Sequence, residues 1–129
     1  QWVKGGVVHG PRSCQPRLKR LTKKMRIQAL KAAFSLKASQ SAIWGLDLGS
    51  EALTKTAQAA KLMAQMPMVG KTLIIMSVQE KKNFLYFRNL TNVTCLLSQN
   101  LNVYDLLKYR SLVLTPSVLQ DLSSRYDLN

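Results

Sequence analysis

TLIIMSV, residues 72–78, is apolar on both faces of an extended chain, and its purely apolar core is Leu73–Met76. Strands in the interior of a parallel sheet have this composition because helices cover both faces of the sheet. The run is far shorter than the roughly 20 apolar residues needed to cross a bilayer, and no other run in the chain approaches that length. The segment therefore predicts a buried parallel strand, and we expect no transmembrane role.

Strand and helix patterns alternate on both sides of this segment. Asn102 is a good N-cap residue, and Thr115 places a hydroxyl before Pro116, which suits the first position of a helix. The alternation predicts a three-layer α/β domain with a mainly parallel sheet flanked by helices. The expected strands are 42–48, 72–78, 93–97 and 112–114, and the helices after the first strand are 53–66, 82–90, 102–109 and 116–126.

A longer helix is expected between Pro16 and Ala38, ahead of the first strand. Ile27, Leu30 and Phe34 interrupt its basic side, so we expect it to meet protein on more than one flank. The pattern predicts a core helix with a cationic outer surface. Its apolar stripe comprises Leu18, Leu21, Met25, Ala29, Ala32, Ala33 and Leu36, and its cations are Lys19, Arg20, Lys23, Lys24, Arg26, Lys31 and Lys37.

Residues 1–16 contain three glycines and two prolines and have no helical or strand period. This composition predicts an extended arm whose backbone can approach a ligand closely. We therefore divide the chain into an extended basic N-terminal arm, residues 1–16, and an α/β globular domain, residues 17–129.

The positive charge of the chain is concentrated at one end. Ten of the first 37 residues are Lys or Arg and none is acidic, whereas the remaining 92 residues contain nine basic and six acidic side chains, so +10 of the net +13 lies in the first segment. Such a block repels itself and is expected to settle against a polyanion. The charge favours a nucleic-acid partner over a merely solvated helix face, although composition does not choose RNA over DNA.

The arm also has the residue types that contact nucleic acid. Gly5, Gly6 and the Gly10-Pro11 pair let a backbone approach phosphates. Trp2 and His9 offer flat rings on which bases can stack. Nearby charge comes from Arg12, Arg17, Lys19 and Arg20.

Catalytic and cofactor motifs are weak in this sequence. Gly70-Lys71-Thr72 resembles the end of a phosphate loop, but Gln65 stands where a second glycine is required, and a strand follows where a helix should begin. His9 is the only histidine, and the six carboxylates form no close pair for acid and base catalysis. We expect no cofactor, no metal and no catalytic residues, and we expect Cys14 and Cys95 to be reduced thiols.

Two stretches resemble one known family. WVKGGVVHGPR at residues 2–12 with KKMRIQALKAA at 23–33, together with LNVYDLLK at 101–108 and SLVLTP at 111–116, is similar to the fourth large-subunit ribosomal protein family. The resemblance implies an α/β domain on the outer face of the large subunit and a long loop that reaches the nascent-chain exit tunnel. Residues 1–16 correspond to the returning limb of that loop. The family's first strand, first helix and loop tip would then lie upstream of Gln1.

The resemblance implies a structural constituent of the large ribosomal subunit whose partners are large-subunit rRNA and neighbouring ribosomal proteins, with no small-molecule substrate. The stretch His9-Gly-Pro-Arg12 is similar to mitochondrial members, which favours the mitochondrial matrix over the plastid stroma or bacterial cytoplasm. Two alternatives are a nucleotide-dependent α/β enzyme with a basic arm and a DNA-compacting factor. The residues expected to contact RNA are Trp2, Lys4, Gly5, Gly6, His9, Arg12, Arg17, Lys19, Arg20, Lys23, Lys24, Arg26 and Lys31.

Overall fold

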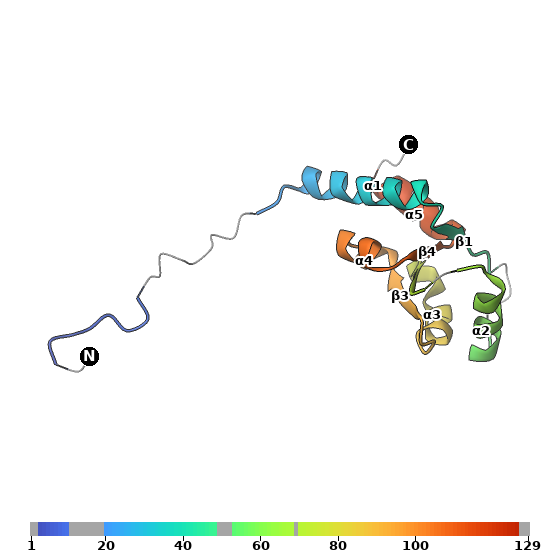
Figure 1. The fold of residues 1–129 in the computed structure, drawn as a ribbon, viewed down its shortest axis with the longest axis horizontal. Helices are drawn as coiled ribbons and strands as arrows, with labels where there is room; N and C mark the ends of the chain where they lie inside the picture. Colours follow the sequence, from blue (N-terminus) through green and yellow to red (C-terminus); the bar gives the residue numbers. More distant parts are fainter. Residues whose placement is uncertain (1–2, 11–19, 49–52, 69, 127–129) are drawn as a thin grey trace.

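A four-stranded parallel sheet forms the centre of the computed structural model, which describes residues 3–10, 20–48, 53–68 and 70–126. Its strands are β1 (Ile43–Gly45), β2 (Thr72–Met76), β3 (Val93–Leu97) and β4 (Ser111–Leu114). They lie in the order β1-β4-β2-β3, and every neighbouring pair is parallel. The fold confirms the predicted parallel sheet and its sequence of elements (Figure 1).

Helices cover both faces of the sheet. The helices are α1 (Lys23–Ser39), α2 (Thr56–Gln65), α3 (Lys81–Phe87), α4 (Val103–Lys108) and α5 (Pro116–Tyr126), and short 3-10 turns at Val78–Glu80 (η1) and Ser98–Asn100 (η2) follow β2 and β3. One apolar cluster joins the sheet to α1, α4 and α5, and the other joins it to α2 and α3. The two clusters confirm the expected three layers.

Strand β2 is central because it pairs with β4 on one side and with β3 on the other. All five of its residues are buried, and its side chains alternate between the two clusters: Leu73 and Ile75 contribute to one, Ile74 and Met76 to the other. An apolar side chain fully removed from water contributes about 1.5–3 kcal/mol. The composition of residues 72–76 thus matches a strand that is covered on both faces.

The first helix differs from its prediction in two ways. It begins at Lys23 rather than shortly after Pro16, because residues 20–22 are not helical and the Thr22 hydroxyl accepts a hydrogen bond from the Met25 amide as the N-cap. Residues 17–19 lie outside the described part of the chain.

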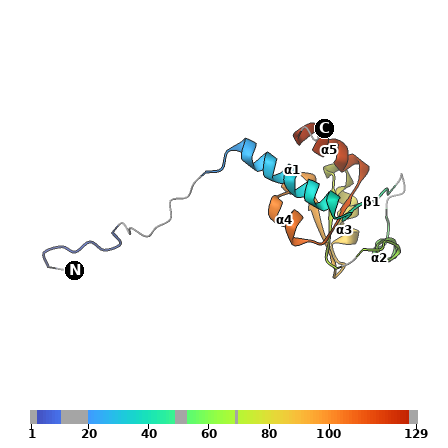
Figure 2. The same cartoon turned by 45° about the horizontal axis from the view of Figure 1, so that its top comes forward.

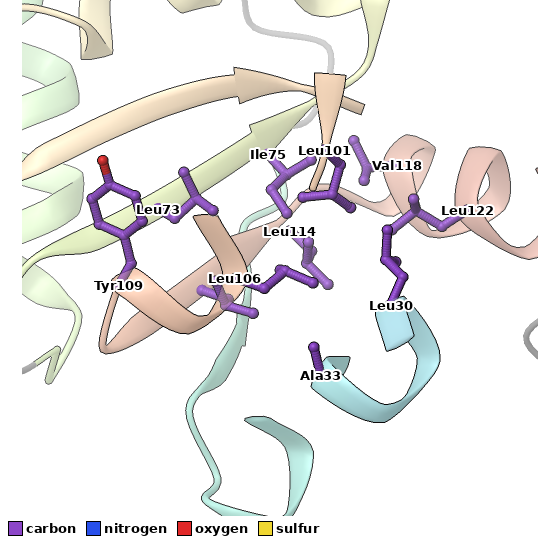
Figure 3. Close-up of a cluster of buried hydrophobic side chains, with 11 residues drawn as sticks. Leu30, Ala33, Leu73, Ile75, Leu101, Leu106, Tyr109, Leu114, Val118 and Leu122 are labelled. Carbon is purple, nitrogen blue, oxygen red and sulfur yellow. The ribbon is translucent and has the colours of Figure 1, made fainter. Parts of the chain in front are cut away.

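The predicted apolar stripe of this helix is also largely wrong, since Ala33 is its one described member that is buried. Leu21 and Met25 are 61% and 56% exposed and Leu36 is 46% exposed, whereas the helix buries Leu30, Ala33 and Lys37. Figure 3 shows Leu30 pointing toward Leu122 of α5. Of the residues that interrupt the basic side, Leu30 is buried and Phe34 packs against the same core cluster. The predicted stripe includes three alanines, and burying a leucine removes more apolar surface from water than burying an alanine.

The remaining elements agree closely with their predictions. Strand β1 is shorter than predicted, spanning 43–45 instead of 42–48, and its one partner among the described strands is β4. Asn102 is confirmed as an N-cap, since its Oδ1 accepts from the Asp105 amide at 2.8 Å. Pro116 begins α5 as expected. Among the described residues, none of the helices combines the length and the apolar composition needed to cross a membrane.

Candidate nucleic-acid interface

In the described part of the arm, residues 3–10, the residues that were expected to contact RNA are exposed. Lys4, Gly5, Gly6 and His9 are all exposed. The backbone turns at Lys4 (φ 72°), Gly5 (φ 69°) and His9 (φ 58°), all in the left-handed region that glycine adopts most easily. Trp2, Arg12, Arg17 and Lys19 lie outside the described residues, so the extended path of the whole arm stays a prediction.

Four of the cations expected to contact RNA lie at or just before the amino-terminal end of α1. Arg20, Lys23, Lys24 and Arg26 are exposed, and the first buried residue of the helix is Leu30. Figures 1 and 2 both show the first turns of α1 extending beyond the sheet and the other helices. Within the described residues, Arg26 donates to the Leu21 carbonyl at 3.5 Å, but none of these four cations is found in an ion pair with a carboxylate. This cationic terminus of α1 is therefore open to an external anion.

The electrostatics of this terminus favour an anionic partner. The first turn of α1 contains Lys23 and Lys24 and no acidic residue. Because unpaired backbone amides already give a helix N-terminus partial positive charge, cations there raise the local potential further. Phosphate groups bind helix N-termini for the same reason. A phosphate would therefore relieve repulsion and accept hydrogen bonds at the same place.

The two remaining α1 lysines behave differently. Lys37 is only 5% exposed, and its Nζ donates to the Tyr109 carbonyl oxygen at 2.7 Å. It is therefore directed into the protein, as the interrupted basic side suggested, and it joins the last turn of α1 to the segment between α4 and β4. Lys31 is half-buried, so it is less accessible than the cations at the helix terminus.

A groove with a volume of about 960 Å³ runs beside the cationic terminus. Its lining includes the apolar side chains of Met25, Leu30 and Leu101, as well as Lys23, Arg26 and Arg125. Leu21 also lines the groove, and both Leu21 and Met25 are exposed. The groove is a second surface feature of this helix, which the prediction of a buried stripe had missed.

The carboxyl edge of the sheet bears on the enzyme alternative, because ligands of open α/β sheets bind outside the carboxyl ends of the strands. Here the chain's own polar side chains occupy this edge. The Thr115 and Ser117 hydroxyls donate to Glu80 Oε2 and Oε1, both at 2.7 Å. The Ser77 and Ser98 hydroxyls donate to Asp121 Oδ2 at 2.9 and 3.3 Å. These two carboxylates hold η1, η2 and α5 together.

Sequence analysis had not identified this hydrogen-bonded set. Glu80, Asp121 and their hydroxyl partners are up to 44 residues apart in sequence. The available signal was positional: Ser77, Ser98 and Thr115 each directly follow a strand. The carboxyl ends of parallel strands lie at the same edge of a sheet, so the three hydroxyls are expected to be close together.

Three other candidate chemical groups have structural explanations. Gly70-Lys71 precedes the buried strand β2 instead of opening a helix, which agrees with a turn rather than a phosphate loop. Cys95 is a free, buried thiol, and burial raises its pKa to about 12; Cys14 lies outside the described residues. In the described ranges no three His, Cys, Asp or Glu side chains come together in a way that could hold a metal ion.

The structure thus defines a parallel α/β domain whose carboxyl edge is occupied by its own side chains and which carries a group of exposed cations at the N-terminus of α1. The chain belongs to the family described as "Ribosomal protein L4/L1 family", whose family model matches residues 1–125. This membership confirms the resemblance seen in residues 2–12 and 101–116.

Individual relatives agree with the family. The chain is 32% identical over 127 residues to large ribosomal subunit protein uL4 of Spiroplasma kunkelii, covering 98% of this chain and 61% of the relative. It is 37% identical over 131 residues to uL4 of Aquifex pyrophilus, covering 98% and 64%. It is 36% identical over 115 residues to uL4 of Thermoanaerobacter sp. strain X514, covering 89% and 55%. These relatives are bacterial, and the chain spans about three fifths of their length.

Proposed function

We propose that this protein is a structural constituent of the large ribosomal subunit, not an enzyme, and that it binds large-subunit rRNA through the cationic terminus of α1 and the basic arm. The observation that carries the proposal is the exposure of Arg20, Lys23, Lys24 and Arg26 at a helix N-terminus that contains no acidic side chain. Membership in a ribosomal protein family and the similarity to uL4 proteins support it. The proposed mechanism is neutralisation of phosphates, which holds rRNA segments in a fixed relation to the domain.

The residues proposed to contact rRNA are those expected from the sequence. The α1 cations supply charge, Gly5 and Gly6 allow close approach of the backbone, and His9 and Trp2 offer stacking surfaces. Arg12, Arg17 and Lys19 extend the same charge between the arm and the helix. Lys31 is the weakest member of the set, because it is half-buried.

The position near the exit tunnel is a further part of the proposal. It rests on the resemblance of residues 1–16 to the returning limb of the family's long loop. Neighbouring large-subunit proteins are the other proposed partners. The compartment is proposed on other grounds. The His9-Gly-Pro-Arg12 stretch favours a mitochondrial ribosome, and the similarity to bacterial uL4 proteins also allows a bacterial cytoplasm.

The test is the salt dependence of binding between the whole 129-residue chain and large-subunit rRNA. If about six cations meet phosphates, log affinity falls against log salt with a slope of about −4 to −5. A variant with Arg20, Lys23, Lys24 and Arg26 all changed to Gln should flatten that slope by about 3. A control that changes the exposed Lys55, Lys61, Lys81 and Lys82 to Gln removes the same charge elsewhere.

The control should keep a slope close to that of the unchanged protein. Equal slopes for the two variants would show that net charge alone drives binding and would contradict an interface on α1. Competition with duplex DNA separates the remaining alternative: preference for DNA over rRNA at the same salt concentration would favour a DNA-compacting factor.

A further inference from the structure

A second group of cations lies at the amino edge of the sheet, at the opposite ends of the strands from the Glu80 and Asp121 network. Lys71 directly precedes β2, and Arg110 directly precedes β4. The register of these neighbouring strands pairs Thr72 with Ser111, so Lys71 and Arg110 are opposite each other. The Arg110 amide donates to the Lys71 carbonyl at 3.0 Å, and both side chains are exposed.

This arrangement leaves positive charge without an internal counterion. Two like charges on adjacent strands repel each other. Across the ranges that the structure describes, neither Lys71 nor Arg110 is found in an ion pair. The segments that connect each helix to the following strand, residues 40–42, 66–71, 88–92 and 109–110, contain no Asp or Glu. By contrast, Glu80 and Asp121 carry their charge at the carboxyl edge.

Helix α4 extends this surface with a third cation and an exposed ring. Lys108 ends α4 two residues before Arg110, and its Nζ lies 5.5 Å from the centre of the Tyr104 ring and 5.6 Å from that of Tyr109. Tyr104 is 68% exposed. Exposed aromatic rings beside cations are the usual stacking platforms for unpaired bases.

A role in stabilising the fold explains the position of only one of these three cations. A cation in the last turn of a helix interacts favourably with the helix dipole, which accounts for Lys108. Lys71 and Arg110 belong to no helix. The Arg110 side chain lies against Gly70, where an added Cβ would be 3.6 Å from Arg110 Cδ. The guanidinium stem is thus packed at the edge of the sheet with no carboxylate partner among the described residues.

We infer that Lys71, Lys108 and Arg110, together with the ring of Tyr104, form a second rRNA contact surface that binds the backbone of an unpaired RNA segment. The inference rests on the proposed function and adds a contact to it. The Lys37–Tyr109 hydrogen bond places the last turn of α1 at this edge. Lys23 is 14 residues earlier in the same helix, about 20 Å away along its axis. At that separation, one phosphate group cannot contact both surfaces.

The test compares two variants of the whole chain that lose the same charge. Lys71→Gln with Arg110→Gln removes the amino-edge pair, and Lys81→Gln with Lys82→Gln removes two exposed lysines from the start of α3, at the carboxyl edge. Losing two phosphate contacts should lower affinity for large-subunit rRNA roughly tenfold at about 0.15 M salt and flatten the salt slope by about 1.4. The Lys81/Lys82 variant should keep the affinity of the unchanged protein within about twofold.

A Tyr104→Leu variant tests the aromatic ring separately, because this substitution leaves the net charge of the chain unchanged. It should weaken binding to RNA that contains an unpaired segment and leave binding to fully paired RNA unchanged, because paired bases are already stacked. Circular dichroism and thermal unfolding of each variant establish that the fold is intact, as expected for exposed side chains.

The outcomes separate this inference from the proposed function. If the α1 variant flattens the salt slope but the Lys71/Arg110 variant behaves like its control, the second surface is wrong and the proposed function stands. If the unchanged chain shows no salt-dependent binding to rRNA, both fail. If the Lys71/Arg110 variant keeps its rRNA affinity but loses a neighbouring large-subunit protein in reconstitution, the edge is a protein contact, which also overturns the inference.

Discussion

Replacing Glu80 with Ala should lower the free energy of unfolding by about 2–3 kcal/mol, although the residue lies at the end of the short η1 turn rather than in the apolar core. Glu80 accepts two hydrogen bonds of 2.7 Å, from Thr115 Oγ1 and Ser117 Oγ, and a weaker one of 3.3 Å from the Ser77 amide. A hydrogen bond to a charged group contributes about 1.5–3 kcal/mol. Glu80 is half-buried, so we count each of the two short bonds at the lower end of that range.

The loss should be largest where the donor has no access to water. Thr115 is 1% exposed, so without Glu80 its hydroxyl loses a partner that solvent cannot easily replace. Glu80→Gln keeps the shape of the side chain but weakens both hydroxyl bonds, and it should cost about half as much as Glu80→Ala. For a chain of this length, 2–3 kcal/mol corresponds to a fall in Tm of roughly 8–12 °C.

Urea unfolding followed by far-UV circular dichroism measures this effect, with Lys82→Ala as an exposed control in the neighbouring helix. Thr115→Val and the double variant complete a double-mutant cycle, in which we expect a coupling of about 1 kcal/mol or more between Glu80 and Thr115. The reasoning is refuted if Glu80→Ala unfolds within 0.5 kcal/mol of Lys82→Ala. It is also refuted if the two side chains prove independent. Affinity for rRNA should not change in either case.

Three further predictions concern the core, the buried Lys37 and the buried thiol of Cys95. Leu106→Ala should cost about 3 kcal/mol in urea unfolding, because Leu106 is fully buried between α1 and the sheet; a cost below about 1 kcal/mol would place α4 outside the core. Lys37→Ala should lower the free energy of unfolding by about 1–3 kcal/mol, because it leaves the Tyr109 carbonyl without its donor. Lys24→Ala removes an exposed lysine of the same helix and should change that free energy by less than about 0.5 kcal/mol. Equal effects of the two substitutions would contradict the buried position of Lys37. In a Cys14→Ser background, Cys95 should react with iodoacetamide at pH 8 about a thousandfold more slowly than an ordinary thiol. Burial raises the pKa of Cys95 from 9.0 to about 12, which lowers the fraction present as the reactive thiolate. Rapid labelling of the folded protein would contradict that burial.

Much of the architecture was readable from local patterns. The apolar run of β2, the N-cap at Asn102 and the proline at the start of α5 all predicted the elements in which they occur. Each of these signals acts within a few residues, so it survives without knowledge of the remaining fold. Even the burial of β2 on both faces followed from its composition alone.

The orientation of α1 could not be read in the same way. Both of its flanks contain apolar residues, so helical periodicity alone does not show which flank meets the core. Leu30 and Ala33 face the core because α4 and α5 offer Leu106 and Leu122 on that side. Leu21 and Met25 are left exposed beside the groove as a consequence.

By itself the sequence determined that the chain forms alternating helices and strands with a central buried strand, and that its positive charge is concentrated near one end. Hydrophobic periodicity and charge count are local properties, so the order of residues is sufficient to establish them. Only the tertiary structure decided that Glu80 and Asp121 close the carboxyl edge, and that Lys71 and Arg110 stand side by side at the amino edge. Those neighbours are 23 to 44 residues apart in sequence, and only the pairing of parallel strands brings them together.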